Sequence, residues 1–401
     1  MYKNYYLIIL NSGGMSMKKL IIFILLIIFI SPLYVFALDN KEELIPGSVS
    51  GVLMEASSGK ILFEKEKNKK VSVASMTKMV AQIIILENIE KGNIKWTDKV
   101  TVSKNASSMG GSQIYLSEGE KVTVKDLMKG ISMASGNDAT VAMAEVISGS
   151  EAKFVDLMNK KVKELGLKNT VFKNCTGLDE QGHYSTAYDM AVIARELVVN
   201  HPEILKFSSV YEDYLREDTS NKFWLVNTNK LVRYYEGADG LKTGHTDNAK
   251  YCLAATAKRG DMRLIAIVLG EDDSKKRNNE AMGLLDYGFN NYRYTKLKDR
   301  GSIIKKISLE KADKDNINVL LSNDLGVMED KNSNKHNYKY KVNINNIKLP
   351  IKKNSVVGKI IVKENNKVVS SSDLIIKEDI NNINYLGLLI NNLKEVISGN
   401  Y

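Results

Sequence analysis

An apolar run that begins just after a serine and ends near a glycine constrains this chain more than any other feature. The run, Met79–Leu86, continues into a charged segment that ends at Gly92. This pattern predicts a buried helix over Met76–Ile89. Ser75 would then lie at the start of the helix, with Lys78 one turn further on the same face. Because the first turn carries unpaired N–H groups and a partial positive charge, it favours an oxyanion there.

The spacing S-x-x-K is weak evidence on its own for an activated serine. It occurs five times, beginning at Ser16, Ser57, Ser75, Ser150 and Ser302. Only Ser75 combines a helix start with an apolar segment that can bury the lysine. Helix capping remains the alternative for Ser75, and equally for Ser150 ahead of a helix expected from Glu151.

The length of 401 residues predicts two domains. Near the N-terminus a basic start, Met17-Lys18-Lys19, precedes the apolar run Leu20–Ile30, and small residues follow at Val35 and Ala37. We interpret residues 1–37 as a leader and secretory signal peptide, so the mature protein is expected to be exported and extracytoplasmic. The apolar core is short for a membrane span, and an uncleaved signal anchor is the alternative.

The charge and the reactive side chains exclude several functions. The leader contributes three lysines and no acid to the net charge of +10, which leaves +7 for the mature chain. The lysines are scattered, which argues against a nucleic-acid partner. Histidines lack metal-ligand spacing, so we expect no metal and no cofactor. Cys175 and Cys252 either pair outside the cell or remain buried thiols, and both alternatives stay open.

A second polar triplet, Ser135-Gly136-Asn137, falls between two expected helices over residues 124–133 and 138–147. Such a sharp link can present a hydroxyl and a carboxamide to a pocket, although both residue types also favour helix ends. The same S-x-N spacing begins at Ser103 and Ser398. The small-residue loop 107–112 either lines a cleft or is a plain surface turn.

The tripeptide Lys242-Thr243-Gly244 occurs once and is followed by His245. Two strongly β segments come next, residues 251–257 and 263–270. On a strand, the glycine lets a substrate backbone approach and the lysine can hold a carboxylate. The alternative for Lys242 is a solubilising side chain on an exposed edge strand.

The C-terminal part changes to Asn- and Lys-rich β segments, at residues 303–309, 317–321, 338–344, 355–362 and 367–370. We expect a domain boundary near Tyr294, with domains over 38–294 and 295–378. Residues 379–401 carry apolar side chains at helical spacing, from Ile380 to Ile397. This terminal amphipathic helix either contacts a membrane peripherally or docks onto the protein itself.

Together the three motifs resemble those of the low-molecular-weight penicillin-binding proteins, the serine-type D-alanyl-D-alanine carboxypeptidases with S-x-x-K, S-x-N and K-T-G motifs. The runs Ala74–Lys78, Gly182–Ala187 and Asp239–Thr246 match this family. The match is strong over Gly47–Tyr292 and looser beyond it. The resemblance implies an α+β, β-lactamase/transpeptidase-like domain, with an antiparallel sheet flanked by helices, followed by a small all-β domain.

The resemblance also implies the catalytic residues. Ser75 would be the acylated nucleophile, and Lys78 would take its proton while neutral, its pKa lowered by burial and by the Lys242 cation. Ser135 would relay a proton to the leaving D-alanine, and Asn137 would hold the peptide amide.

The same resemblance assigns substrate binding to the K-T-G strand. Lys242 and Thr243 would bind the terminal carboxylate, and Gly244 would let the substrate approach. The backbone N–H groups of Ser75 and His245 would form the oxyanion hole. Where the family commonly has Ala-Gly after this strand, the chain has Ala249-Lys250. This departure affects packing rather than the named chemistry.

The implied reaction is removal of the terminal D-alanine from the peptidoglycan stem pentapeptide through an acyl-enzyme. Such an enzyme takes part in cell-wall biogenesis and remodelling and in maintaining cell shape. It is acylated by penicillins and other β-lactam antibiotics. It acts in the cell envelope, in association with the membrane. A β-lactamase is disfavoured because no E-x-x-L-N run lies between Asn137 and Lys242. A non-catalytic wall- or membrane-binding protein is disfavoured because every chemically necessary residue is present.

Overall fold

The computed structural model describes residues 44–383 except residues 218, 334 and 335. The predicted signal peptide lies outside the described residues, as does most of the predicted terminal helix. Within the described ranges, none of the helices is long and apolar enough to cross a membrane.

The N-terminal part is organised around a five-stranded antiparallel sheet with the order β2-β1-β9-β8-β7. Its strands are β1 (Ser50–Glu55), β2 (Ile61–Lys65), β7 (Ala238–Thr246), β8 (Lys250–Arg259) and β9 (Met262–Glu271). Strands β1 and β2 form a hairpin ahead of the Ser75 segment, and the strongly β segments predicted after the K-T-G tripeptide become the neighbouring interior strands β8 and β9. The K-T-G strand itself, β7, is at one edge of the sheet.

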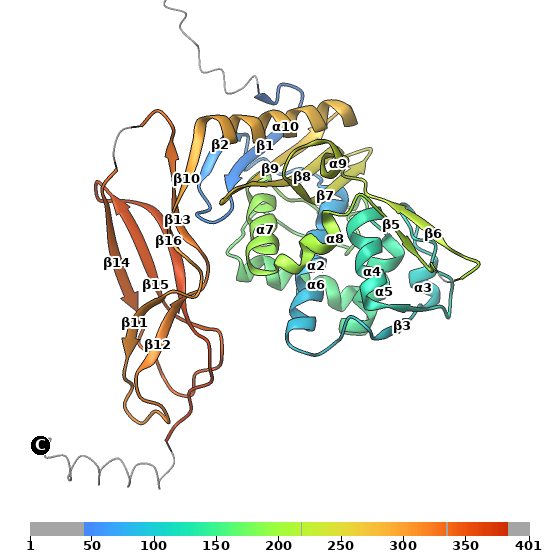
Figure 1. The fold of residues 1–401 in the computed structure, drawn as a ribbon. Helices are drawn as coiled ribbons and strands as arrows, with labels where there is room; N and C mark the ends of the chain where they lie inside the picture. The colour runs from blue at the N-terminus through green and yellow to red at the C-terminus, as the bar shows by residue number, and fades with distance from the viewer. Residues whose placement is uncertain (1–43, 218, 334–335, 384–401) are drawn as a thin grey trace, which may run out of the picture. The chain divides into compact units, whose positions relative to one another are not determined.

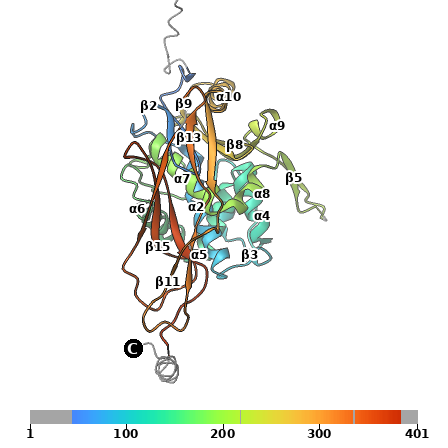
Figure 2. The same cartoon turned by 60° about the vertical axis from the view of Figure 1, so that its left-hand side comes forward.

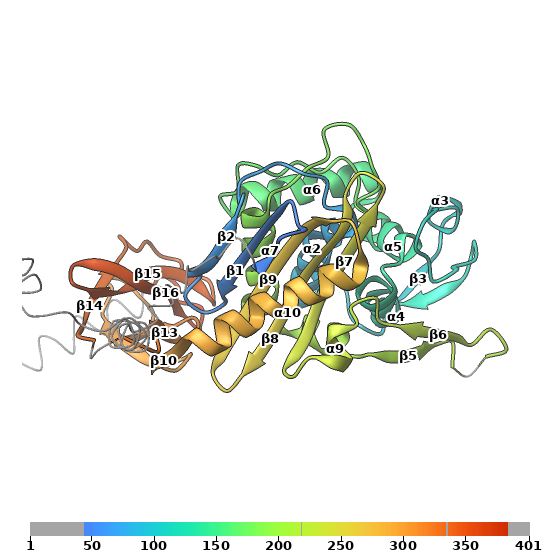
Figure 3. The same cartoon turned by 90° about the horizontal axis from the view of Figure 1, so that it is seen from above.

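Helices cover both faces of this sheet, as predicted. Helix α10 (Ser274–Asn291) packs on one face, where it contacts β8 and β9 (Figures 1 and 3). Helix α7 (Ala187–Asn200) packs on the other face, against β1 and β9. Each face therefore has an apolar core of its own.

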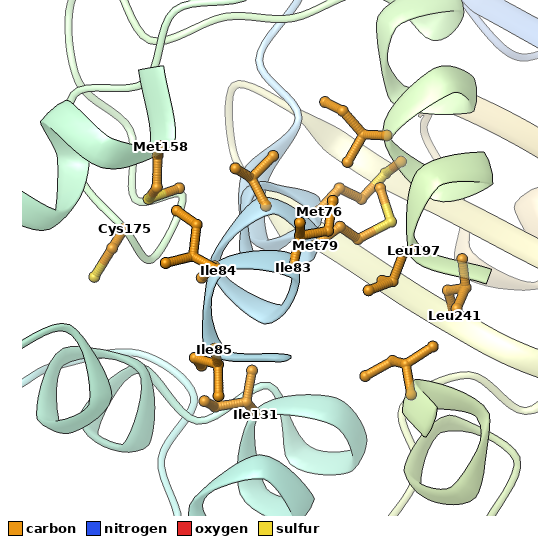
Figure 4. Packing of buried hydrophobic residues seen from close by; sticks show 14 of the residues in the cluster. Met76, Met79, Ile83, Ile84, Ile85, Ile131, Met158, Cys175, Leu197 and Leu241 are labelled. Carbon is orange, nitrogen blue, oxygen red and sulfur yellow. The ribbon is translucent and has the colours of Figure 1, made fainter. Parts of the chain in front are cut away.

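Helix α2 (Lys78–Glu90) lies inside the larger of these cores. Its residues from Lys78 to Leu86 are all buried. Figure 4 shows its side chains directed to opposite sides, with Ile85 next to Ile131 and Ile83 facing Leu197. A helix that is apolar all round is stable only when protein surrounds it. The apolar run thus explains why this helix is central.

The remaining elements of the N-terminal part are helices and two hairpins. The helices are α3 (Lys104–Ser107), α4 (Val124–Lys129), α5 (Asn137–Ser148), α6 (Glu151–Glu164), α8 (Leu205–Ser208) and α9 (Leu231–Tyr234), and a 3₁₀ turn spans Pro202–Ile204. Two short hairpins pair β3 (Lys99–Thr101) with β4 (Lys121–Thr123), and β5 (Glu212–Leu215) with β6 (Phe223–Val226). Ser150 caps α6 through Lys153 N–H, so its capping role is confirmed.

The helix predicted over residues 124–133 is present, but it changes type in its second half. The α-helix ends at Lys129, and a π-helical turn follows over Gly130–Ala134. At this turn the backbone of Gly130 packs so closely on the Ile114 side chain that an added Cβ would lie 2.8 Å from it. The sequence also gave no expectation of the β5–β6 hairpin.

The C-terminal part is all-β, as predicted (Figure 2). A five-stranded sheet has the order β11-β12-β16-β15-β14, and β10 pairs with β13. The bounds are β10 (Tyr292–Lys298), β11 (Ile303–Ile307), β12 (Ile317–Leu321), β13 (Leu325–Asp330), β14 (Tyr338–Ile344), β15 (Ser355–Glu364) and β16 (Lys367–Ile376). Strands β10 and β13 were not foreseen. The domain boundary near Tyr294 stays a prediction, since β10 runs across it.

Candidate active site

Ser75 and Lys78 lie together at the start of α2. Ser75 is in a 3₁₀ turn over Ala74–Thr77, and the α-helix begins only at Lys78. The Lys78 Nζ atom is 2.7 Å from Ser75 Oγ, and the same nitrogen donates to the backbone oxygen of Thr176 at 2.7 Å. Neither the turn nor the helix has a side-chain cap. The capping alternative for Ser75 is therefore wrong, and its hydroxyl faces the lysine instead.

Burial sets the protonation of Lys78. Its side chain is 0% exposed. Removal from water lowers the pKa of Lys78 to about 7, while the nearby Cys175 and Asp138 act in the opposite direction. A lysine with this pKa is largely neutral at slightly alkaline pH and can accept a proton from a neighbouring hydroxyl.

Two glycines let other segments approach the Ser75 turn closely. A Cβ on Gly244 would lie 2.6 Å from the Val73 backbone oxygen, and a Cβ on Gly177 would lie 2.0 Å from the Ala74 oxygen. Gly177 also has a φ of +85°, which favours glycine. The turn is thus held between strand β7 and the loop that carries Thr176.

The S-x-N residues belong to the π-helical turn and the start of α5. Ser135 has a left-handed backbone with φ +63°, and Asn137 is the first residue of α5. Asn137 Nδ2 donates to the Gly110 oxygen at 2.6 Å, and its backbone N–H donates to the Ser112 oxygen at 2.7 Å. The small-residue loop 107–112 therefore contacts the site and is more than a plain surface turn.

Two polar atoms of this motif are buried and unsatisfied. Ser135 Oγ and Asn137 Oδ1 have no hydrogen-bond partner among the residues that the structure describes. A buried polar atom without a partner costs about 1–3 kcal/mol. Such atoms are expected where a ligand supplies the missing bond.

The K-T-G residues all lie on β7. Lys242 is 1% exposed, so the alternative of a solubilising side chain is wrong, although β7 is an edge strand. Its Nζ donates to the Thr243 oxygen at 3.0 Å, and Thr243 Oγ1 donates to Thr228 Oγ1 at 2.8 Å. His245 is exposed, and its ring lies 4.2 Å from the ring of Tyr251 on the neighbouring strand.

The charge around Lys242 is positive. Burial holds the pKa of Lys242 well below its usual value, and the Lys78 and Arg277 cations lower it further. We expected the repulsion to act on Lys78, whereas in the structure burial alone lowers the pKa of Lys78 and the repulsion acts on Lys242. Arg277 is itself buried on α10, where it donates to the Cys252 oxygen at 3.1 Å. A carboxylate bound here would offset this repulsion and favour the charged form of Lys242.

Sequence reasoning missed several groups of the site. Thr176 contributes only its backbone oxygen, which leaves no side-chain signal. Asp138 accepts hydrogen bonds from the backbone of Ile114 and Leu116 and fixes the start of α5. The position of Asp138 next to Asn137 was a usable signal, whereas nothing in the sequence pointed to Thr228 or Arg277.

The two cysteines, both in the described part of the chain, are buried free thiols. The open alternative of a disulfide is therefore not realised. Burial raises the pKa of Cys252 to about 11, so this thiol is unreactive at neutral pH.

This fold and this site define a class of protein. A serine hydroxyl next to a buried lysine of lowered pKa, on a helix behind an antiparallel sheet, is the arrangement of an active-serine enzyme that forms an acyl intermediate. The family model "D-alanyl-D-alanine carboxypeptidase" matches residues 42–273, and the model "Penicillin-binding protein 5, C-terminal domain" matches residues 292–382. The chain belongs to this D-alanyl-D-alanine carboxypeptidase family.

Individual relatives agree with this assignment. The chain is 47% identical over 354 residues to the D-alanyl-D-alanine carboxypeptidase DacF of Bacillus subtilis, covering 88% of this chain and 91% of the relative. The crystal structure of penicillin-binding protein 5 from Haemophilus influenzae is 33% identical, with a TM-score of 0.66 over 84% of this chain and 98% of that chain. Penicillin-binding protein D2 from Listeria monocytogenes, in its ampicillin-bound form, is 30% identical with a TM-score of 0.55 over 61% of this chain and 98% of that one.

The predictions of family, fold class and enzyme class are thereby confirmed. The protein is a D-alanyl-D-alanine carboxypeptidase, a hydrolase of the penicillin-binding group. The family acts on peptidoglycan peptides and binds β-lactams, and an extracytoplasmic location agrees with this membership.

Proposed function

We propose that Ser75 is the nucleophile with which this carboxypeptidase removes the terminal D-alanine of the peptidoglycan stem pentapeptide. The observation that carries the proposal is the 2.7 Å contact between Ser75 Oγ and Lys78 Nζ, at a lysine whose pKa is about 7. A hydroxyl becomes a competent nucleophile when a positioned base takes its proton during attack.

The acylation step uses Lys78 as the base. Ser75 Oγ attacks the carbonyl carbon of the penultimate D-alanine, and its proton passes to Lys78 Nζ. The bond to the terminal D-alanine breaks, and the proton held by Lys78 passes through Ser135 to the leaving nitrogen, which returns Lys78 to its neutral form. The Ser135 hydroxyl has no other partner among the described residues. Water then hydrolyses the Ser75 ester. The backbone N–H groups of Ser75 and His245 stabilise the oxyanion of both steps.

Lys242 and Thr243 bind the terminal carboxylate, and Asn137 holds the peptide amide. A bound carboxylate favours the ammonium form of Lys242, which burial otherwise disfavours. The renewed charge on Lys242 keeps the nearby Lys78 neutral, as a base must be. Substrate binding therefore prepares the base, and the cation of Arg277 behind the strand adds to the field that attracts the carboxylate.

Penicillins follow the same path up to the ester. The Listeria relative has been crystallised in its ampicillin-bound form, and the Ser75 contacts described above support acylation of this chain by penicillins. A fluorescent penicillin is expected to label the wild type and to leave Ser75→Ala unlabelled. Mass spectrometry with a pentapeptide should show loss of one D-alanine. Equal labelling of both proteins would refute the assignment of Ser75.

The protein is proposed to work in the cell envelope, in cell-wall biogenesis and remodelling, in association with the membrane. The support is sequence pattern alone: the leader 1–37 and the amphipathic pattern of residues 379–401. Deletion of residues 384–401 followed by cell fractionation tests the membrane contact. A truncated protein that stays with the membranes would show that this segment is not the anchor.

A further inference from the structure

A loop over residues 171–185 contacts the Ser75 turn from two places. Its ends are joined by backbone hydrogen bonds in both directions between Val171 and Tyr184, at 2.9 and 3.0 Å. From one arm, the Thr176 oxygen accepts the hydrogen bond from Lys78 Nζ at 2.7 Å. From the other arm, His183 reaches Thr77, the residue just before Lys78, at 2.8 Å.

The tautomer of His183 follows from its contacts. The backbone N–H of Lys173, in the opposite arm, donates to His183 Nδ1 at 3.2 Å. Nδ1 is therefore the acceptor, and the ring proton is on Nε2, which donates to Thr77 Oγ1. One imidazole thus ties the two arms of the loop to each other and to the Ser75 turn.

The same segment holds the chain on the other side of Ser75. Val71 and Ser185 exchange two backbone hydrogen bonds, at 2.9 and 3.0 Å. The stretch Val71–Thr77 is therefore held at both ends by residues 183–185, with the nucleophile between them. The bond from His183 to Thr77 can be removed by a side-chain substitution that leaves the backbone and Lys78 unchanged.

We propose that His183 is a positioning residue, which holds the Thr176 oxygen and the Ser75 turn in the geometry that lets Lys78 work as a base. It acts through Thr77 and the loop and does not itself touch the substrate. This inference rests on the proposed function of Ser75 and Lys78, and it explains why the run Gly182–Ala187, which has no role in the acylation chemistry, accompanies the three motifs.

His183 keeps this tautomer over the working pH range. Burial lowers the pKa of His183 to about 4, against the opposing charges of Glu180 and Asp179 from its own loop. The charged and titratable groups that face Lys78 are Asp138 from α5, Cys175 from the loop and Lys242 from β7. None of these groups forms a hydrogen bond with His183 in the described structure, so substitution of His183 tests position rather than local charge.

Two conservative variants separate the two bonds of the imidazole. The amide nitrogen of glutamine can occupy the place of Nε2 and keep the bond to Thr77, whereas the shorter asparagine can reach only the place of Nδ1 and the Lys173 N–H. His183→Gln should retain penicillin acylation within about threefold, and His183→Asn should lose about tenfold or more, as misplaced catalytic groups do. Two variants of Thr77 test the same bond from its other partner. Thr77→Ser keeps the hydroxyl that bonds to His183 and should behave as His183→Gln, whereas Thr77→Val removes the hydroxyl and should behave as His183→Asn.

The pH profile distinguishes positioning from a purely structural role. A displaced loop admits water to Lys78, which raises its pKa towards the ordinary value. The midpoint of the acylation profile should therefore move to higher pH in His183→Asn and stay near 7 in His183→Gln. Equal rates and equal midpoints in the two variants would overturn the inference, as would a rate loss that only follows a lower Tm.

A failure of the His183 proposal can be distinguished from a failure of the Ser75 proposal. If penicillin fails to label the wild type, the assignment of Ser75 fails first. The titration of Lys78 by NMR with ¹⁵N-labelled lysine then still tests the inference, since its pKa should rise in His183→Asn and in Thr77→Val but not in His183→Gln or Thr77→Ser. An unchanged Lys78 pKa in all four variants would refute it.

Discussion

The backbone oxygen of Thr176 lies 2.7 Å from Lys78 Nζ, and the same nitrogen lies 2.7 Å from Ser75 Oγ. A neutral amine can donate one N–H to the carbonyl while its lone pair accepts the serine proton. The carbonyl thus orients the lysine without adding a negative charge, which would raise its pKa. This pair explains how a lysine can serve as a base near neutral pH.

The rate of acylation should depend on pH through Lys78. Burial lowers the pKa of Lys78 to about 7, so its neutral form increases as the pH rises through that value. The second-order rate of penicillin acylation should rise about tenfold between pH 6 and pH 8 and then level off. This rate can be measured by stopped-flow fluorescence with a fluorescent penicillin. A rate that still climbs steeply above pH 9 would mean that Lys78 has an ordinary pKa.

Lys242→Met should impair recognition of the substrate carboxylate more than folding. The variant removes an amine whose charged form is disfavoured by burial, so the free energy of unfolding should be unchanged or higher. Hydrolysis of a pentapeptide should fall about 100-fold, because a charge-assisted bond to the carboxylate is lost.

A peptide with a terminal carboxamide provides the control for Lys242. The wild type should prefer the free carboxylate strongly, and Lys242→Met should lose this preference. Lys258→Met, an exposed lysine on the adjacent strand β8, removes the same charge away from the site and should behave as the wild type. Unchanged discrimination in Lys242→Met would contradict the carboxylate role.

Gly177→Ala should displace the Ser75 turn. The new Cβ would lie 2.0 Å from the Ala74 oxygen and 2.9 Å from the Ser75 nitrogen, so the backbone must shift. Acylation should fall about 100-fold or more, since a shift of about 1 Å has such an effect on positioned groups.

Gly149→Ala is the matched control for Gly177→Ala. Gly149 has φ +81°, close to the +85° of Gly177, but a Cβ there meets nothing within 4 Å. This variant should lose about 1 kcal/mol of stability from its left-handed backbone and keep its acylation rate. If both variants lose activity equally, backbone strain rather than contact with the turn is responsible.

Lys250→Gly should stabilise the protein. Lys250 is the first residue of β8, directly after the turn that follows β7, and has φ +55°, at the position where the family resemblance led us to expect glycine. Glycine adopts this conformation without a Cβ clash, so the free energy of unfolding in urea should rise by about 0.5–1 kcal/mol. Lys250→Ala removes the side chain but keeps the strain, and should show no gain. An equal gain in both variants would attribute the effect to the lysine side chain.

The sequence predicted well the elements whose side chains show a strong local pattern. The apolar run of α2 and the apolar segments of β8 and β9 were found because burial selects residue types at each position. Strands β10 and β13 were missed, although the alternation of Tyr292 and Tyr294 with polar residues was a usable signal. The β5–β6 hairpin was missed because its strands are only four residues long.

The chemistry of the site was predicted in the same way, and only in part. Ser75, Lys78, Ser135, Asn137, Lys242 and Thr243 could be named because three motifs occur in one order in the chain. The sequence also placed Ser75 at the first turn of a helix, whereas the structure puts it in a 3₁₀ turn. That difference arises because the close approach of Gly177 and Gly244 decides the backbone conformation there.

The sequence by itself thus named the side chains that we propose carry the reaction, and it determined which segments must be buried. Tertiary structure alone decided the protonation of Lys78 and Lys242, the acceptor role of the Thr176 oxygen and the contact between His183 and Thr77. These properties depend on distances between segments about 100 residues apart, and on water excluded by their packing. Every residue carries a backbone oxygen, so the residue type gives no sign that this oxygen has a role. Burial is a property of the assembled fold. Neither can therefore be predicted from local sequence.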